Sequence, residues 1–314
     1  MRTGVLPRAF IQEVVTRDGL QIEPRFLPTE DKVALIDALS QTGVAKIEVT
    51  SFVSPRAVPN LADAREVARA IRRRPDVTYV ALVPNLRGAE AALEADMDEL
   101  NLVLSVSETH NLANMRMTPQ DSLEGFRAIV AAAAGTRAAL NGSIATAFGC
   151  PFEGAQPAEK VLDLAEAYLA VGLQSVTLAD TTGMANPRQV FALVSAFRAR
   201  FGDVKLTLHF HNTRGMGLAN VLAALEAGAD RFDASLGGIG GCPFAPGATG
   251  NISTEDLVHM LEAMGVETGV DLPALLALAR SLPALLGHDI PGQVAKAGRS
   301  GDLHPVPAHL RAAQ

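Results

Sequence analysis

The stretch KLTLHFHNTRGMGLANVLAALEAGADRFDA, residues 205–234, shows the repeating unit that decides the fold. A short apolar run at 205–211 is followed by a longer amphipathic run, and then by a second short apolar run at 231–234. This order is typical of parallel strands that are connected by helices. The unit therefore predicts a strand, a helix and a second strand of one parallel sheet.

The same alternation occurs eight times along the chain. The predicted strands are 10–15, 46–50, 78–83, 99–104, 140–145, 175–179, 205–211 and 231–234. Helix-start signals lie between them, at Thr29, Thr118-Pro119, Gln156-Pro157, Asn186-Pro187 and Ser253. Eight units within about 265 residues favour a closed (β/α)8 TIM barrel of the α/β class. An open doubly wound sheet is the alternative, but the GxGxxG signature is absent after the first strand.

Composition narrows the class of protein. The chain has 314 residues, 48% of them hydrophobic, which predicts a sizeable core. A net charge of −7 and an aromatic content of 4% argue against nucleic acid as a partner. Two cysteines favour a reducing compartment, the cytoplasm, and no stretch predicts a membrane span. We expect a TIM-barrel catalytic domain at 1–270 and a C-terminal helical extension and tail at 271–314.

Polar residues gather where the predicted strands end, which is where TIM barrels carry their active sites. They follow five different strands and comprise Arg17 and Asp18, Glu48, Asp180, His209 and His211, and the glycine-rich loop 237–251. We therefore expect one functional site at this end of the barrel.

His209 and His211 are the sharpest local signal. Residues i and i+2 of a strand face the same side, so the two imidazoles lie side by side and, with Asp18, can form a metal site. Such a ligand set suits Mg²⁺, Mn²⁺ or Co²⁺ better than structural zinc. The alternative is that both histidines are merely hydrogen-bonded in a polar barrel mouth.

Arg17 and Cys242 each allow two interpretations. A buried guanidinium needs a partner, so Arg17 either forms a salt bridge with Glu48 or Asp180 or stabilises a developing oxyanion. Cys242 lies in the glycine-rich loop, which is either a lid that carries a proton donor or a surface loop with an incidental thiol. The other histidines, His110 among them, are expected to be surface or packing residues.

Several longer motifs carry a resemblance to a known family. The strings RDGLQ, IEVTSFVSP, FGCPFEG, HFHNT and LGGIGGCPFAPGATGNISTEDLV resemble those of hydroxymethylglutaryl-CoA lyases. The resemblance implies a metal-dependent TIM-barrel carbon–carbon lyase that cleaves an acyl-CoA, and it allows a homodimer. The metal ligands that it implies are Asp18, His209, His211 and Asn251, with Mg²⁺ or Mn²⁺ as the ion.

The implied reaction is a retro-Claisen cleavage of a 3-hydroxyacyl-CoA such as hydroxymethylglutaryl-CoA to acetyl-CoA and acetoacetate. His209 or Asp18 would take the hydroxyl proton, Arg17 would hold the enolate, and Cys242 would take part in returning a proton. Glu48 and Asp180 would support the site. The substrate-binding residues that we expect are Gln21, Asn141, Ser143, Arg214, Gly240 and Gly241.

The sequence also departs from the family pattern. The family form HDTYG is HNTRG here, with Asn212 and Arg214, and the Arg and Tyr of the fifth strand are replaced by Asn141 and Ser143. These changes alter the volume and charge of the acyl pocket. Citramalyl-CoA, cleaved to acetyl-CoA and pyruvate, is therefore an alternative substrate. A Claisen-type synthase and a non-catalytic metal-binding barrel are the remaining hypotheses.

Overall fold

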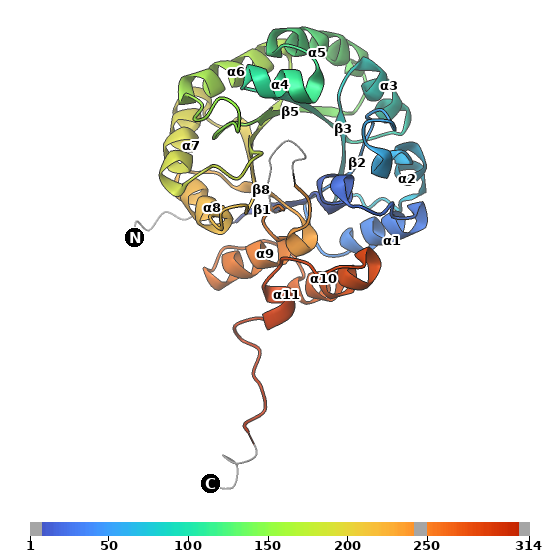
Figure 1. Ribbon diagram of the computed structural model, residues 1–314, viewed down its shortest axis with the longest axis vertical. Helices are drawn as coiled ribbons and strands as arrows, with labels where there is room; N and C mark the ends of the chain where they lie inside the picture. The colour runs from blue at the N-terminus through green and yellow to red at the C-terminus, as the bar shows by residue number, and fades with distance from the viewer. Residues whose placement is uncertain (1–7, 242–249, 308–314) are drawn as a thin grey trace.

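The computed structural model describes residues 8–241 and 250–307 and contains a closed barrel of eight parallel strands in sequential order, ringed by helices (Figure 1). The strands are β1 Phe10–Glu13, β2 Lys46–Ser51, β3 Thr78–Val83, β4 Glu99–Ser105, β5 Ala139–Ala145, β6 Ser175–Asp180, β7 Lys205–Phe210 and β8 Arg231–Ala234. The eight predicted strands and the (β/α)8 barrel are thus confirmed.

Helices connect successive strands and cover the outside of the barrel. They are α1 Thr29–Leu39, α2 Ala64–Ala70, α3 Leu86–Glu94, α4 Glu108–Met115, α5 Pro119–Ala133, α6 Ala158–Val171, α7 Pro187–Phe201 and α8 Gly217–Glu226. The start signals at Thr118 and Asn186 act as the sequence predicts, because their side chains accept hydrogen bonds from the backbone N–H groups of Asp121 and Gln189. Pro157, by contrast, precedes α6 instead of being its first residue.

Most strands have one apolar face toward the helices and one largely polar face inside the barrel, whereas β3 turns the apolar Val80 and Leu82 inward. In β7, Leu206, Leu208 and Phe210 are fully buried among the core residues. The inward face carries hydrogen bonds instead, such as that from Nε2 of Gln12 to Oγ1 of Thr207 at 3.2 Å. A polar barrel interior costs free energy unless its groups are paired, so its residues must be placed by their partners.

Three further helices follow the barrel, α9 Thr254–Ala263, α10 Leu272–Leu286 and α11 Val294–Ala297. They lie together on one side of the ring, where α9 contacts β1 and β8 and α10 contacts α1 (Figure 1). The C-terminal helical extension is therefore present, whereas its division from the barrel at residue 270 stays a prediction. Within the described residues, no helix has the length and apolarity needed to cross a bilayer.

Candidate active site

A π-helical turn, η1 Val15–Gly19, carries the first two site residues. The N–H groups of Asp18 and Gly19 both donate to the carbonyl of Val14, at 2.8 and 3.2 Å. This turn ends β1 at Glu13, two residues earlier than the sequence predicts. Turns with this wide hydrogen-bond pattern recur at functional sites. Here the turn brings Arg17 and Asp18 to the mouth of the barrel, where both line its cavity.

The two histidines of the seventh strand meet Asp18 in the same place. Nε2 of His209 lies 3.1 Å from Nε2 of His211, and Oδ2 of Asp18 lies 3.9 and 3.6 Å from these two nitrogens. All three side chains are buried, and one donor atom of each lies within 4.8 Å of the others. The described residues therefore contain a possible metal site made of Asp18, His209 and His211.

Asn251 joins this group from the far end of the glycine-rich loop. Its backbone forms an antiparallel bridge with His211, and its Nδ2 donates to Oδ2 of Asp18 at 2.7 Å. Its Oδ1 is buried without a hydrogen-bond partner among residues 8–241 and 250–307, and so is Nδ1 of His211. A buried acceptor left unpaired beside a carboxylate and two imidazoles fits a divalent cation.

Neighbouring charges and burial determine the protonation states of Asp18, His209 and His211. Burial alone would raise the pKa of Asp18, but the Arg17 guanidinium and the two imidazoles hold it well below its usual range. Burial would lower the pKa of His209, yet the carboxylate of Asp233, 3.1 Å from Nδ1, raises it above the ordinary value. Burial lowers the pKa of His211. An ionised carboxylate beside a neutral imidazole is the state that a metal requires.

Arg17 is paired on two sides. Its Nε donates to Oε2 of Glu48 at 2.5 Å, and its Nη1 donates to Oδ1 of Asp18 at 2.6 Å. Of the two partners that the sequence predicts, Glu48 is right and Asp180 is wrong. Burial raises the pKa of Glu48, although the guanidinium works against this shift. The salt bridge and the second role, stabilisation of an oxyanion, are compatible because the guanidinium has further N–H donors.

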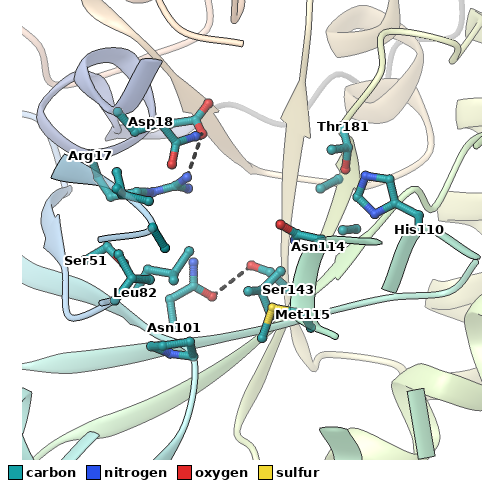
Figure 2. Close-up of a pocket in the computed structure, with 18 of the residues that line it drawn as sticks. Arg17, Asp18, Ser51, Leu82, Asn101, His110, Asn114, Met115, Ser143 and Thr181 are labelled. Carbon is teal, nitrogen blue, oxygen red and sulfur yellow. Dashed lines mark hydrogen bonds and ion pairs between the residues drawn. The ribbon is translucent and has the colours of Figure 1, made fainter. Parts of the chain in front are cut away.

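A cavity of about 960 Å³ opens above these residues (Figure 2). Arg17 and Asp18 lie on one side of it and His110 and Thr181 on the other, with Asn101 and Ser143 between them (Figure 2). The predicted substrate-binding residues Gln21, Ser143 and Gly241 are among its lining residues. Gln21 also donates from Nε2 to Oδ1 of Asp18 at 2.7 Å.

Other predicted residues lie elsewhere. Arg214 is exposed and donates to the backbone carbonyls of Thr182 and Gly183, so it does not place a cation in the cavity. Asn141 lies deeper in the barrel, below the cavity lining, where its amide is held by other side chains. Neither residue lines the cavity, and their part in substrate binding stays a prediction.

Asp180 and Gly240, two further predicted site residues, lie at the edges of the site. Asp180 accepts the backbone N–H groups of Met184 and Ala185, and burial raises its pKa to about 6. It holds the loop after β6 and does not line the cavity. Gly240 packs against Asp18 and Asn251. Cys242 lies outside the described residues, so its role stays a prediction.

Sequence reasoning missed three residues of this region. Asp233 of β8 contacts His209, and Asn101 of β4 lines the cavity. His110 is buried, lines the same cavity, and has its Nδ1 2.7 Å from Oγ of Ser105. The signal for Asn101 and Asp233 was available, since each is a polar residue on the inward face of a predicted barrel strand.

Comparison with known proteins identifies the family of this chain. The family model described as HMGL-like matches residues 8–282. The chain belongs to the HMGL-like family. Among its relatives, hydroxymethylglutaryl-CoA lyase of Bacillus subtilis is 45% identical to this chain. The match covers 90% of this chain and 95% of the Bacillus enzyme. The (R)-citramalyl-CoA lyase of Chloroflexus aurantiacus is also 45% identical, over 92% of this chain and 94% of its own.

Solved structures of HMGL-like proteins agree with the fold. An HMG-CoA lyase from Acinetobacter baumannii, in complex with coenzyme A and 3-methylmalate, has a TM-score of 0.93 and 59% identity. The match covers 96% of this chain and 98% of that one. The family resemblance predicted from the sequence motifs is thereby confirmed.

Proposed function

We propose that this HMGL-like protein is a divalent-metal-dependent lyase that cleaves a 3-hydroxyacyl-CoA by a retro-Claisen reaction. The principal substrate is hydroxymethylglutaryl-CoA, which would give acetyl-CoA and acetoacetate. The observation that carries the proposal is the pairing of Arg17 with Asp18, at 2.6 Å, beside the two imidazoles at the base of a large cavity. A cation site and a guanidinium in contact are what an enolate-forming cleavage needs.

Asp18, His209, His211 and Asn251 are the residues that would hold the ion. When bound, Mg²⁺ or Mn²⁺ supplies a Lewis acid that lowers the pKa of the substrate hydroxyl. The four side chains offer oxygen and imidazole nitrogen without a thiolate, which suits these ions. The unpaired Oδ1 of Asn251 supports this assignment.

Arg17 would stabilise the negative charge that develops during bond cleavage. When the C–C bond breaks, its electron pair passes to the thioester as an enolate, while the former hydroxyl carbon becomes the keto group. Glu48 and Asp18 occupy Nε and Nη1 of Arg17, so the guanidinium is fixed before the substrate arrives. Charge that is held in place in advance is the usual source of large electrostatic catalysis.

Proton transfer would use His209 or Asp18 as the base for the hydroxyl proton. Asp233 accepts from Nδ1 of His209, which leaves Nε2 directed to Asp18 and His211. A proton must then reach the enolate carbon to form acetyl-CoA, and Cys242 is the donor that we propose for it.

The cavity mouth supports a CoA thioester as the substrate. Arg56 and Arg116 line the cavity and are exposed, although the chain as a whole carries a net charge of −7. Guanidinium groups favour phosphate oxygens, which the nucleotide end of CoA provides. We also propose the cytoplasm as the compartment, and a homodimer remains a prediction.

Citramalyl-CoA is the second candidate substrate. The citramalyl-CoA lyase relative is as identical to this chain as the hydroxymethylglutaryl-CoA lyase of Bacillus subtilis, at 45%. Both substrates release acetyl-CoA, and they differ only in the keto acid that remains.

The test is a substrate panel with the purified protein and Mg²⁺ or Mn²⁺. We expect acetyl-CoA and acetoacetate from hydroxymethylglutaryl-CoA, identified by mass spectrometry, and no turnover after the metal is removed with EDTA. Faster release of pyruvate from citramalyl-CoA would favour the second substrate. Failure to cleave either compound with any divalent metal would contradict the proposal and leave the Claisen-type synthase and the non-catalytic metal-binding barrel.

A further inference from the structure

A chain of hydrogen bonds crosses the barrel interior and ends at Arg17. It starts in β6, where Oγ of Ser175 donates to Oδ1 of Asn141 at 2.8 Å. Nδ2 of Asn141 then donates to Oδ1 of Asn101 at 2.9 Å. Nδ2 of Asn101 donates to Oε1 of Glu48 at 2.8 Å, and Glu48 holds Arg17 through its other oxygen. Asn101 is therefore the link between the barrel wall and the Glu48–Arg17 pair.

The orientation of the Asn101 amide is determined by its partners. Its Oδ1 accepts two donors, Nδ2 of Asn141 and Oγ of Ser143, the latter at 2.8 Å (Figure 2). The amide of Asn141 is fixed in turn, because its Oδ1 accepts from Ser175 and its Nδ2 also donates to Thr177 at 3.0 Å. A reversed Asn101 amide would turn its NH₂ toward a donor and its oxygen toward a carboxylate. Nδ2 must therefore face Glu48.

Glu48 needs this support because it is buried and both of its carboxylate oxygens accept hydrogen bonds. Its side chain is 5% exposed, and Asn101 is 8% exposed. With Asn101 on Oε1 and Arg17 on Oε2, the carboxylate cannot rotate without losing one partner. Loss of a partner inside a barrel leaves a polar group unpaired, which costs about 1–3 kcal/mol. The position of Arg17 thus depends on a residue that does not touch it.

We propose that Asn101 is a positioning residue for the reaction, which fixes Glu48 so that Arg17 is aimed at the developing enolate. This rests on the proposed function, since it assumes that Arg17 acts on substrate charge. Asn141 and Ser143 are then anchors of Asn101. Both departures from the family pattern on the fifth strand therefore contact Asn101.

The first test is steady-state kinetics of Asn101→Ala on the acyl-CoA that the wild type cleaves. We expect kcat to fall by about 10- to 100-fold while KM changes by less than about twofold, since the loss concerns charge stabilisation rather than binding. The loss of Mn²⁺ affinity, measured by calorimetry, should be smaller than the loss of kcat, because Asn101 hydrogen-bonds Glu48, Asn141 and Ser143 and reaches Asp18 only through Glu48 and Arg17. An unchanged kcat, or a loss confined to KM or to Mn²⁺ affinity, would overturn the proposal.

A control separates positioning from simple loss of a buried amide. Asn220 is also a buried asparagine, with Nδ2 donating to the carbonyl of Ala185 at 3.3 Å, but it lies in α8 outside the barrel. Asn220→Ala should lower the melting temperature and leave kcat within about twofold. An equal fall of kcat in both variants would show a general structural effect and reject the positioning role.

The second variant, Asn101→Asp, tests the hydrogen bond itself. The carboxyl group of this variant can donate to Glu48 only while it is protonated. The kcat of Asn101→Asp divided by the wild-type kcat should therefore fall as pH rises. The corresponding ratio for Asn101→Ala should not change with pH, because methyl has no proton to lose. A flat ratio for both variants would contradict the proposal.

A crystal structure makes the outcome independent of turnover. In Asn101→Ala, we expect the Glu48 carboxylate and the Arg17 guanidinium to move by about 1 Å relative to a wild-type crystal structure, a displacement large enough to impair catalysis. If the wild type cleaves no acyl-CoA, the proposed function fails, while this comparison still decides whether Asn101 positions Arg17. Unmoved side chains would overturn the inference.

Discussion

Nε2 of His209 and Nε2 of His211 face each other at 3.1 Å, with Oδ2 of Asp18 within 4 Å of both. Two imidazole nitrogens at this distance either share a proton or bind one cation. Because burial lowers the pKa of His211, its ring is neutral near pH 7 and is available as a ligand.

Metal binding should therefore depend on this group. We predict that Asp18→Ala weakens Mn²⁺ binding by at least about 100-fold in calorimetry, since it removes the anionic ligand. Binding by the wild type should weaken as pH falls, because the proton competes with the metal for the imidazoles. Asp302→Ala, which removes a half-buried carboxylate far along the chain and paired with Arg299, is the control and should bind normally. Equal affinities in the two variants would place the ion elsewhere.

Replacement of Arg17 should separate catalysis from stability. We predict that Arg17→Gln lowers kcat by about 10²- to 10³-fold and also reduces the free energy of unfolding in urea, because Glu48 and Asp18 lose their buried cation. Arg17→Lys keeps the charge but cannot reach two carboxylates with a fixed fork. It should recover part of the stability and little of kcat. Full kcat in Arg17→Lys would refute the need for the guanidinium geometry.

The raised pKa of Glu13 leads us to expect that stability depends on pH. Its Oε1 accepts the N–H groups of Val15 and Leu236 at 2.9 Å, and burial raises its pKa from 4.5 to about 8. Between these two values folded Glu13 holds a proton that the unfolded chain loses, so the contribution of Glu13 to stability is full at low pH and is lost as pH rises toward 8.

Glu13→Gln should remove this contribution. Its amide oxygen can still accept both backbone N–H groups, and its NH₂ can donate to Thr254, which donates to Glu13 at 2.8 Å in the wild type. We expect urea unfolding of the variant to vary less with pH between 5 and 8, by an amount up to about 1.4 kcal/mol per pH unit. Parallel curves for wild type and variant would show that Glu13 is ionised throughout.

Gly240 should be essential to the metal site because of its backbone. Its φ is +108°, and a Cβ there would lie 2.7 Å from Nδ2 of Asn251 and 2.9 Å from the carbonyl of Asp18. We predict that Gly240→Ala weakens Mn²⁺ binding by about 10- to 100-fold, as displacement of a ligand's support does. Gly154→Ala, at φ +76° with nothing within 4 Å, should bear a similar backbone strain and bind Mn²⁺ normally.

Periodicity predicted the barrel and the metal group well because both follow from strand geometry. His209 and His211 fall on one face by the rule of alternate residues, and Asp18 follows β1 at the same end of the barrel. Asn251 came from the family resemblance alone, since no local pattern links it to Asp18. The structure supplies that link through the bridge between Asn251 and His211.

The positions of Asn141, Arg214 and Asn101 could not be predicted in the same way. Asn141 and Ser143 share one face of β5, but the sequence does not tell which level of the barrel opens into the cavity, and only Ser143 reaches it. Arg214 lies in a loop, whose conformation is set by turns and contacts rather than by period. Asn101 was overlooked because its strand reads as apolar, although a single amide in such a strand requires a partner.

The bridge between His211 and Asn251 also constrains the order of maturation. Asp18 and Asn251 are 233 residues apart in the chain, yet their side chains touch. A nascent polypeptide carries its aspartate early and lacks the amide until nearly the whole ring has been synthesised. If the ion binds where we propose, its complete set of ligands exists only after the first and last strands have paired, so metal uptake would report ring closure.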